Sequence, residues 1–121
     1  MTRYIKEPSI IASEGTKKKL IEEYFGGVNT GTNAVSIAHM KSPAGWTEPG
    51  QKPEFDEYTV VLAGNLQVET EKEVYQVSAG QAILVTQNEW VTYSSPREGG
   101  AEYISVCIPA FSPDTVHRDE E

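Results

Sequence analysis

The sequence predicts an all-β, single-domain protein, and three observations support this prediction. Short apolar runs alternate with polar residues along the chain, glycine and proline turns separate them at regular spacing, and no run has the periodicity of a long helix. A chain of 121 residues suits one domain that buries roughly two thirds of its unfolded surface. The runs add up to about eight to ten antiparallel strands, the pattern of a sandwich or small barrel.

Residues 1–33 are expected to form an N-terminal arm and the first strands. The stretch 17–25 is ambiguous: its apolar residues recur at helical spacing, yet the run is short and ends at two glycines. We favour a strand there. The arm, residues 1–16, is expected to pack on a neighbour.

Residues 34–108 are expected to form the core of the barrel. In the run 57–62, alternation places Glu57, Thr59 and Val61 on one face and Tyr58, Val60 and Leu62 on the other. Gly64-Asn65 is interpreted as a tight connection to the next strand. The remaining strands are predicted at 34–40, 66–68, 74–77, 82–85, 90–94 and 101–108, and residues 109–121 form a proline-broken, acidic tail.

Composition narrows the function classes. The hydrophobic fraction of 38% and the charged fraction of 23% are typical of soluble globular proteins. The net charge of −8 argues against nucleic acid or an anionic membrane as partner, because both are bound mainly through Lys and Arg. A small molecule or another protein fits better. With no signal peptide or membrane-length apolar run in these residues, the expected location is the cytoplasm.

The single cysteine, Cys107, permits no internal disulfide. Neither histidine is near it in the sequence, and no motif indicates a lowered thiol pKa. We interpret Cys107 as a buried structural thiol.

Two stretches carry a specific spacing. The first runs from Gly45 through five residues to Gln51-Lys52-Pro53, then three residues to Glu57 and six to Gly64. The second opens on Gly80 and continues through Val91 and Tyr93. Two such modules around a short hairpin resemble the cupin family of jelly-roll barrels.

The resemblance implies a cupin-type jelly-roll barrel and raises the question of its metal. In that family three histidines and a glutamate bind one divalent metal inside the barrel. The corresponding positions here are Gln51, Pro53, Glu57 and Val91, so the usual metal is not expected. A weaker alternative is a nonstandard metal site from Glu57, His39 and a third group. The chain is similar in this respect to ethanolamine-utilisation type cupins, which also lack the histidines and keep a glutamate and tyrosines in the barrel.

Glu57 and Tyr93 are the candidate catalytic residues, because the matched motifs direct both side chains into the barrel. A buried carboxylate there can bind a ligand hydroxyl or amine, or act as a general acid or base. An equally weighted interpretation is a Glu57 satisfied by neighbouring Tyr or Thr hydroxyls, or exposed at the rim. Tyr93 is interpreted more readily as a structural tyrosine.

A second group is expected to line the barrel or its mouth and contact a ligand. The two tryptophans suit stacking on a planar ligand, with core or dimer packing as the alternative. His39 and His117 are interpreted as a packed residue and an exposed one. The candidate ligand-binding residues are Gln51, Glu48, Thr59, Val91, Trp46 and Trp90.

These observations lead to three functional hypotheses. The first is a small-molecule-binding protein without the usual cupin metal. The alternative is an enzyme of the isomerase, lyase or cyclase type that acts on a small polar substrate through Glu57 and Tyr93. The third is a subunit that forms a homodimer through its hydrophobic strands.

Overall fold

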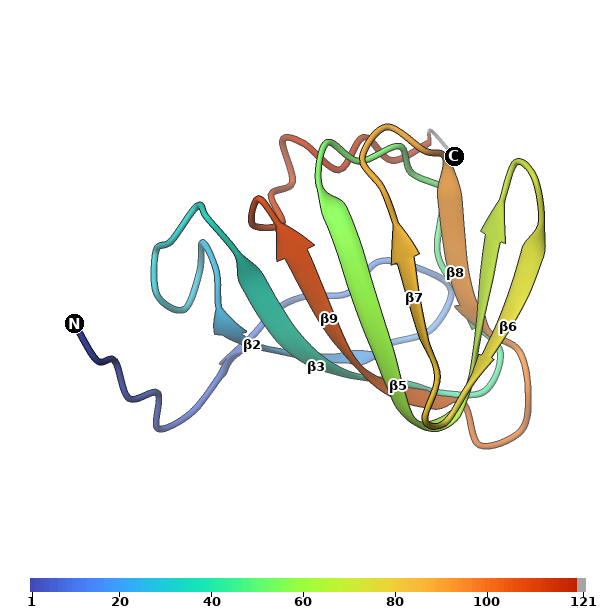
Figure 1. The fold of residues 1–121 in the computed structure, drawn as a ribbon. Coiled ribbons are helices and arrows are strands. Elements are labelled where there is room, and N and C mark those ends of the chain that lie inside the picture. Colours follow the sequence, from blue (N-terminus) through green and yellow to red (C-terminus); the bar gives the residue numbers. More distant parts are fainter. Residues whose placement is uncertain (120–121) are drawn as a thin grey trace.

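The computed structural model describes residues 1–119, and it confirms the all-β fold. Nine antiparallel strands curl into a half-barrel (Figure 1), within the expected number. The described residues contain no helix long and apolar enough to cross a membrane. The strands are β1 (Ser9–Ile10), β2 (Leu20–Phe25), β3 (Ser36–Ser42), β4 (Trp46–Thr47), β5 (Asp56–Thr70), β6 (Val74–Ser78), β7 (Ala82–Val85), β8 (Val91–Ser95) and β9 (Ala101–Ile108).

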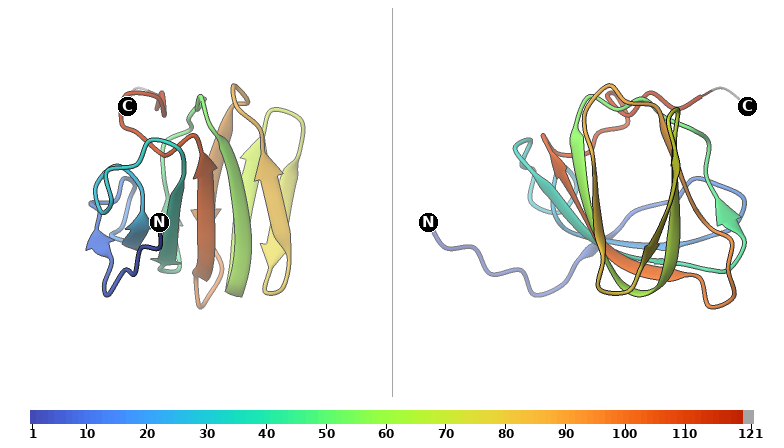
Figure 2. Two further views of the ribbon diagram at one scale, coloured as in Figure 1. Left: turned by 60° about the vertical axis from the view of Figure 1, so that its left-hand side comes forward. Right: turned by 45° about the vertical axis from the view of Figure 1, so that its right-hand side comes forward.

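The strands follow the order β1-β2-β3-β9-β5-β8-β4, and β6 and β7 each pair with β5. The ambiguous stretch forms strand β2, as favoured, because pairing with β1 and β3 satisfies its backbone on both sides. Figure 2 shows the sheet curving around a common interior.

Strand β5 is longer than the sequence indicated. The expected tight connection at Gly64-Asn65 is wrong, because β5 continues through both residues. Its first half pairs with β7 and β9, and its second half pairs with β6 and β8. Gly64, with φ +77°, marks the change of partners. A single strand therefore links the two walls of the half-barrel.

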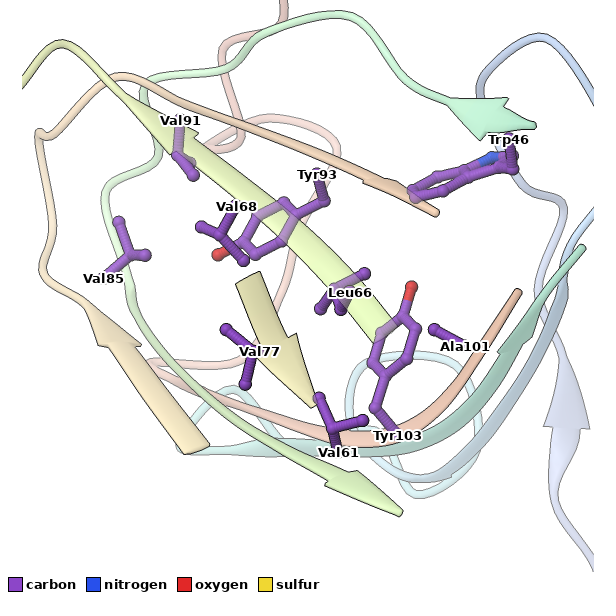
Figure 3. Close-up of a cluster of buried hydrophobic side chains, with 10 residues drawn as sticks. All are labelled: Trp46, Val61, Leu66, Val68, Val77, Val85, Val91, Tyr93, Ala101 and Tyr103. Atoms are coloured by element: carbon purple, nitrogen blue, oxygen red, sulfur yellow. The ribbon is translucent and has the colours of Figure 1, made fainter. Parts of the chain in front are cut away.

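The main core lies between these walls (Figure 3). Thr59 and Val61 are buried, whereas Tyr58, Val60 and Leu62 are exposed, which confirms the predicted alternation of β5. The buried hydrophobic cluster drawn in Figure 3 consists of Trp46, Val61, Leu66, Val68, Val77, Val85, Val91, Tyr93, Ala101 and Tyr103.

Both terminal segments pack on the barrel of their own chain. The Ile11 main-chain N–H donates to the carbonyl of Ile21, and that of Thr16 donates to the carbonyl of Thr47. In the tail, Val116 packs with Phe55 in a second cluster that also contains Cys107 and Phe111. The segments that carry Ile11 and Thr16 at one end and Val116 at the other therefore border the interior of the barrel.

Candidate functional site

The half-barrel and its terminal segments enclose a cavity of about 240 Å³. This volume corresponds to about eight water-sized groups, taking about 30 Å³ for each. The wall combines apolar side chains with charged and polar ones. The lining residues are Ile11, Ala12, Glu14, Lys19, Ile21, Glu23, Ser36, Ala38, Met40, Glu48, Gln51, Glu57, Tyr93, Tyr103, Ser105, Cys107, Phe111, Pro113 and Arg118.

The apolar part of the wall comes from the arm and from β2 and β3. Ile11 follows β1, and Ile21 points inward from β2. Ala38 and Met40 lie two residues apart on β3, so alternation directs both into the cavity. This part can accept the carbon skeleton of a small ligand.

Glu57 lines the cavity from β5, in the same sheet as β2 and β3, as the alternation of β5 predicted. The Ser105 hydroxyl donates a hydrogen bond of 2.6 Å to Glu57 Oε2. Burial raises the pKa of Glu57, although the Ser105 hydrogen bond and the Lys19 charge oppose the rise. The sequence predicted a neighbouring Tyr or Thr hydroxyl as the partner of Glu57. The structure adds Ser105, which only strand pairing brings close to Glu57.

Glu48 lines the same cavity rather than standing at a solvated rim. Burial raises its pKa to about 7, the charge of Lys19 opposes the rise, and the charge of Glu57 adds to it. Two carboxyl groups therefore face one cavity, and one of them exchanges its proton near neutral pH.

Gln51 and Tyr93 contribute two buried polar groups to this wall, and each residue is 4% exposed. Gln51 Oε1 has no hydrogen-bond partner within residues 1–119, and the Tyr93 hydroxyl has none there apart from the nearby Glu57 carboxylate, with which it interacts closely enough to affect both pKa values. Burial, followed by the nearby charges of Glu57 and Glu48, raises the pKa of Tyr93 well above its ordinary value. Tyr93 therefore keeps its proton and can donate it in a hydrogen bond.

Lys19 is a cavity residue that sequence reasoning missed. Its ammonium donates a 3.0 Å hydrogen bond to the Tyr103 hydroxyl and lies 4.0 Å from the centroid of the Trp46 ring. Burial alone lowers the pKa of Lys19, but Tyr103, Glu48 and Glu57 outweigh it, so the pKa is raised. The sequence did contain a signal for it, because Lys19, Ile21 and Glu23 are spaced two residues apart and alternation places them on one face of a strand.

Arg118 is the second missed residue, because the tail was interpreted as a polar end. A β-bridge pairs it with Gln51, and its guanidinium lies 5.7 Å from the centroid of the Phe111 ring. Its buried Nε has no hydrogen-bond partner in the described part of the chain. The tail thus brings a positive charge to the same wall.

Two other lining residues have structural surroundings. The Glu23 carboxylate accepts main-chain hydrogen bonds from Val28 and Asn29, which holds the turn after β2. Cys107 is buried, and burial raises the pKa of its thiol well above the ordinary value. This is the environment expected for a structural thiol.

Four predicted ligand contacts lie outside the cavity wall. Thr59 and Val91 are buried and are not among the residues that line the cavity. Trp46 is fully buried and donates its indole N–H to the Glu14 carbonyl, whereas the Trp90 indole donates to Asp119 in the tail. The expectation that these four side chains line the cavity is therefore wrong.

The comparisons with known proteins agree on the fold. No family model matches the chain. A Thermotoga maritima structure described as a predicted oxalate decarboxylase has a TM-score of 0.73 at 17% identity, over 90% of this chain and 99% of that one. A Bacillus subtilis oxalate decarboxylase variant has a TM-score of 0.77 at 15% identity, over 95% of this chain and 31% of that one. This chain has the cupin fold.

One further solved structure and one sequence relative are similar to the chain. An ethanolamine utilization protein Q from Salmonella typhimurium has a TM-score of 0.67 at 17% identity, over 87% of this chain and 98% of that one. In sequence, the chain is 43% identical over 101 residues to a Myxococcus xanthus protein named endoribonuclease YbeY. The match covers 84% of this chain but spans only about a third (34%) of the relative.

The residues present do not fit the usual cupin metal. Of the four matched positions, Gln51 and Glu57 line the cavity, while the positions of two family histidines are occupied by Pro53 and Val91, whose side chains cannot coordinate. Within residues 1–119, no cluster of three or more His, Cys, Asp or Glu side chains is arranged to hold an ion.

His39 also excludes the nonstandard alternative with Glu57. Its neighbours Ala38 and Met40 face the cavity, so alternation turns His39 to the outer face of β3. There Nδ1 lies 2.9 Å from Glu22 Oε1 and Nε2 lies 2.6 Å from Glu102 Oε2. The proposed pairing of Glu57 with His39 is therefore wrong.

The two carboxylates around His39 favour its protonated form. The hydrogen bond to Glu22 raises the pKa of His39, burial opposes it, and Glu102 adds to the rise. His117 is exposed, as expected, and pairs with Glu54.

Proposed function

We propose that this cupin-fold chain binds a small polar molecule in its cavity without the usual cupin metal. The observation that carries the proposal is the buried, unpartnered Gln51 Oε1 in the cavity wall, with the buried Tyr93 hydroxyl facing the same cavity. An unsatisfied buried donor or acceptor costs about 1–3 kcal/mol. A polar ligand that pairs with both groups removes that cost, and Glu57 and Glu48 supply further acceptors beside them.

An enzyme with the same site is the alternative. Proton transfer is most effective when the catalytic pKa is near the working pH, and the pKa of Glu48 is about 7. Glu57 and Tyr93 face the same cavity, one able to accept a proton and the other able to donate a hydrogen bond. This set supports isomerase, lyase or cyclase chemistry on a small polar substrate.

RNA cleavage is a second candidate function, because the Myxococcus relative is named an endoribonuclease. The charge argues against it here, since 18 acidic and 10 basic residues give a net charge of −8 and phosphates are bound mainly through Lys and Arg. We propose that the nuclease activity named for that relative belongs to the two thirds of its length outside the match.

A screen of small polar metabolites by thermal shift and two-dimensional NMR tests the binding proposal. A ligand at 100 times its dissociation constant stabilises the folded chain by about 2.7 kcal/mol. We expect ligands that raise Tm and shift the amide signals of cavity residues. Conversion of a bound metabolite, abolished in Glu57→Gln, would favour the enzyme alternative.

Two phenylalanine variants provide the matched comparison. Tyr93→Phe removes one cavity hydroxyl and should weaken binding about tenfold, the effect of one hydrogen bond worth about 1.4 kcal/mol. Tyr58→Phe removes an exposed hydroxyl on the outer face of β5 and should leave binding unchanged. Ligands that shift only amides outside the cavity, or that bind Tyr93→Phe as tightly as the wild type, would contradict the proposal.

A further inference from the structure

The polar groups of the cavity wall include acceptors that the protein leaves open. Gln51 Oε1 is buried without a partner in residues 1–119. Glu57 receives the Ser105 hydrogen bond on Oε2, while Glu48 is held through its main chain, donating to the Tyr93 carbonyl and accepting from Thr92. Two carboxylates and an amide oxygen are therefore available to a ligand that donates hydrogen bonds.

The two cations at this cavity both lie against aromatic rings. The Lys19 ammonium donates to the Tyr103 hydroxyl and lies over the Trp46 ring, an arrangement that stabilises a cation without an anion. The Arg118 guanidinium lies over Phe111. The protein therefore stabilises these two cations better than it stabilises the two carboxylates. A cationic ligand is favoured over an anionic one for this reason.

The remaining wall limits the rest of the ligand. Ile11, Ile21, Ala38 and Met40 add apolar surface to the cavity wall. A molecule that contacts this surface and the carboxylates has a polar head and a short hydrocarbon body, and the volume of about 240 Å³ restricts it to a few carbons. The unpartnered Arg118 Nε–H can donate a hydrogen bond to a neutral oxygen of the ligand.

We propose that the ligand class is the small primary amines, bound as ammonium ions whose N–H groups donate to Glu57, Glu48 and Gln51. This inference rests on the proposed small-molecule function and narrows it. Three donors of one ammonium match the three open acceptors. A carboxylate ligand would place its charge against Glu48 and Glu57 instead.

Proton exchange distinguishes the charge of the ligand. An ammonium ion beside Glu48 and Glu57 favours their ionised forms and lowers their pKa values, so binding near pH 7 releases protons. An anion has the opposite effect and takes protons up. Lys19, Arg118 and Glu14 face the same groups, and the raised pKa of Lys19 keeps its ammonium charged in either case.

Matched straight-chain amines, carboxylic acids and alcohols of about two to six carbons test the inference, since the cavity holds about eight water-sized groups. Each is titrated at millimolar concentration by NMR on the full chain, and binders are measured by calorimetry in buffers of different ionisation enthalpy. We expect the amines to bind and release protons at pH 7. Tighter binding of the acids or alcohols, with the same cavity signals shifted, overturns the amine assignment and leaves the proposed function standing.

The glutamine variants complete the test. Glu57→Gln and Glu48→Gln should each weaken amine binding about tenfold or more, and Glu48→Gln should reduce proton release. Glu69→Gln, on β5 but outside the cavity lining, is the control and should leave both unchanged. Amine binding that neither cavity variant alters overturns the inference, and a series in which no compound shifts a cavity signal overturns the proposed function as well.

Discussion

At the scale of single residues, the site is a balance between two half-buried acids and two cations. Glu48 and Glu57 both have raised pKa values because burial disfavours their ionised forms. Lys19 and Arg118 lower both pKa values, but less than burial raises them. The folded chain therefore carries an electrostatic cost that an ionised Glu48 increases.

This cost predicts a pH-dependent effect of Glu48→Gln. The pKa of Glu48 rises from 4.5 to about 7, so the folded state binds a proton in this window that the unfolded state has lost. The contribution of Glu48 to the free energy of unfolding of the wild type consequently falls between pH 4.5 and about pH 7, and it is constant above about pH 7. At about pH 8 we expect Glu48→Gln to be more stable by about 1–3 kcal/mol, with little difference at or below about pH 4.5.

Urea unfolding at several pH values measures this difference. Glu69→Gln serves as the control, because Glu69 lies on β5 outside the cavity lining. A stability gap between wild type and Glu48→Gln that does not grow with pH would show that Glu48 is not held at a raised pKa.

At the scale of elements, β5 determines how the site is assembled. It carries Glu57 in the half that pairs with β7 and β9, and it crosses to β6 and β8 after Gly64. The main chain at Gly64 has φ +77°, and a Cβ there would lie 2.1 Å from the Gly100 carbonyl oxygen. The crossing therefore requires a residue without a side chain.

We predict that Gly64→Ala destabilises the fold by about 2–4 kcal/mol, because the left-handed backbone costs about 1–2 kcal/mol and the contact with Gly100 adds to it. Gly80→Ala is the matched control: Gly80 has φ +83° but no atom lies within 4 Å of its added Cβ. It should lose only the backbone contribution. If urea unfolding shows that both variants lose the same free energy of unfolding, the contact with Gly100 does not contribute to the effect.

At the scale of the whole molecule, the outer face of the β5–β7–β9 wall is apolar. Tyr58, Val60 and Leu62 on β5 are 42%, 46% and 50% exposed, with Leu84 on β7 and Ile108 on β9 each 46% exposed. Tyr58 pairs with Leu84 across β5 and β7, so the exposed groups are neighbours. Contiguous apolar surface of this kind commonly marks an interface.

The homodimer expected from the sequence remains a prediction, and this face is where we place it. Copies of a chain with net charge −8 repel one another, so they approach most easily through uncharged surface. Sedimentation at micromolar concentration should show a dimer for the wild type and a monomer for Val60→Asp. Val74→Asp alters a similarly exposed valine on β6 and should remain dimeric, whereas a monomeric wild type would contradict the prediction.

The sequence by itself determined the strands, the cupin spacing and the inward direction of Glu57 and Tyr93. These follow from local rules, since alternation fixes which face a side chain takes and glycines permit the positive φ angles at the motif ends. The same rules say nothing about which distant residues meet across the barrel.

Only the tertiary structure decided the composition of the site. It brings Lys19 to Tyr103 across 84 positions of sequence and Ser105 to Glu57 across 48 positions. It also withdraws Trp46 into the core, turns His39 outward and places Arg118 beside Gln51. These outcomes depend on strand pairing and on the packing of both termini, because burial and charge at one position are set by neighbours that sequence spacing does not reveal.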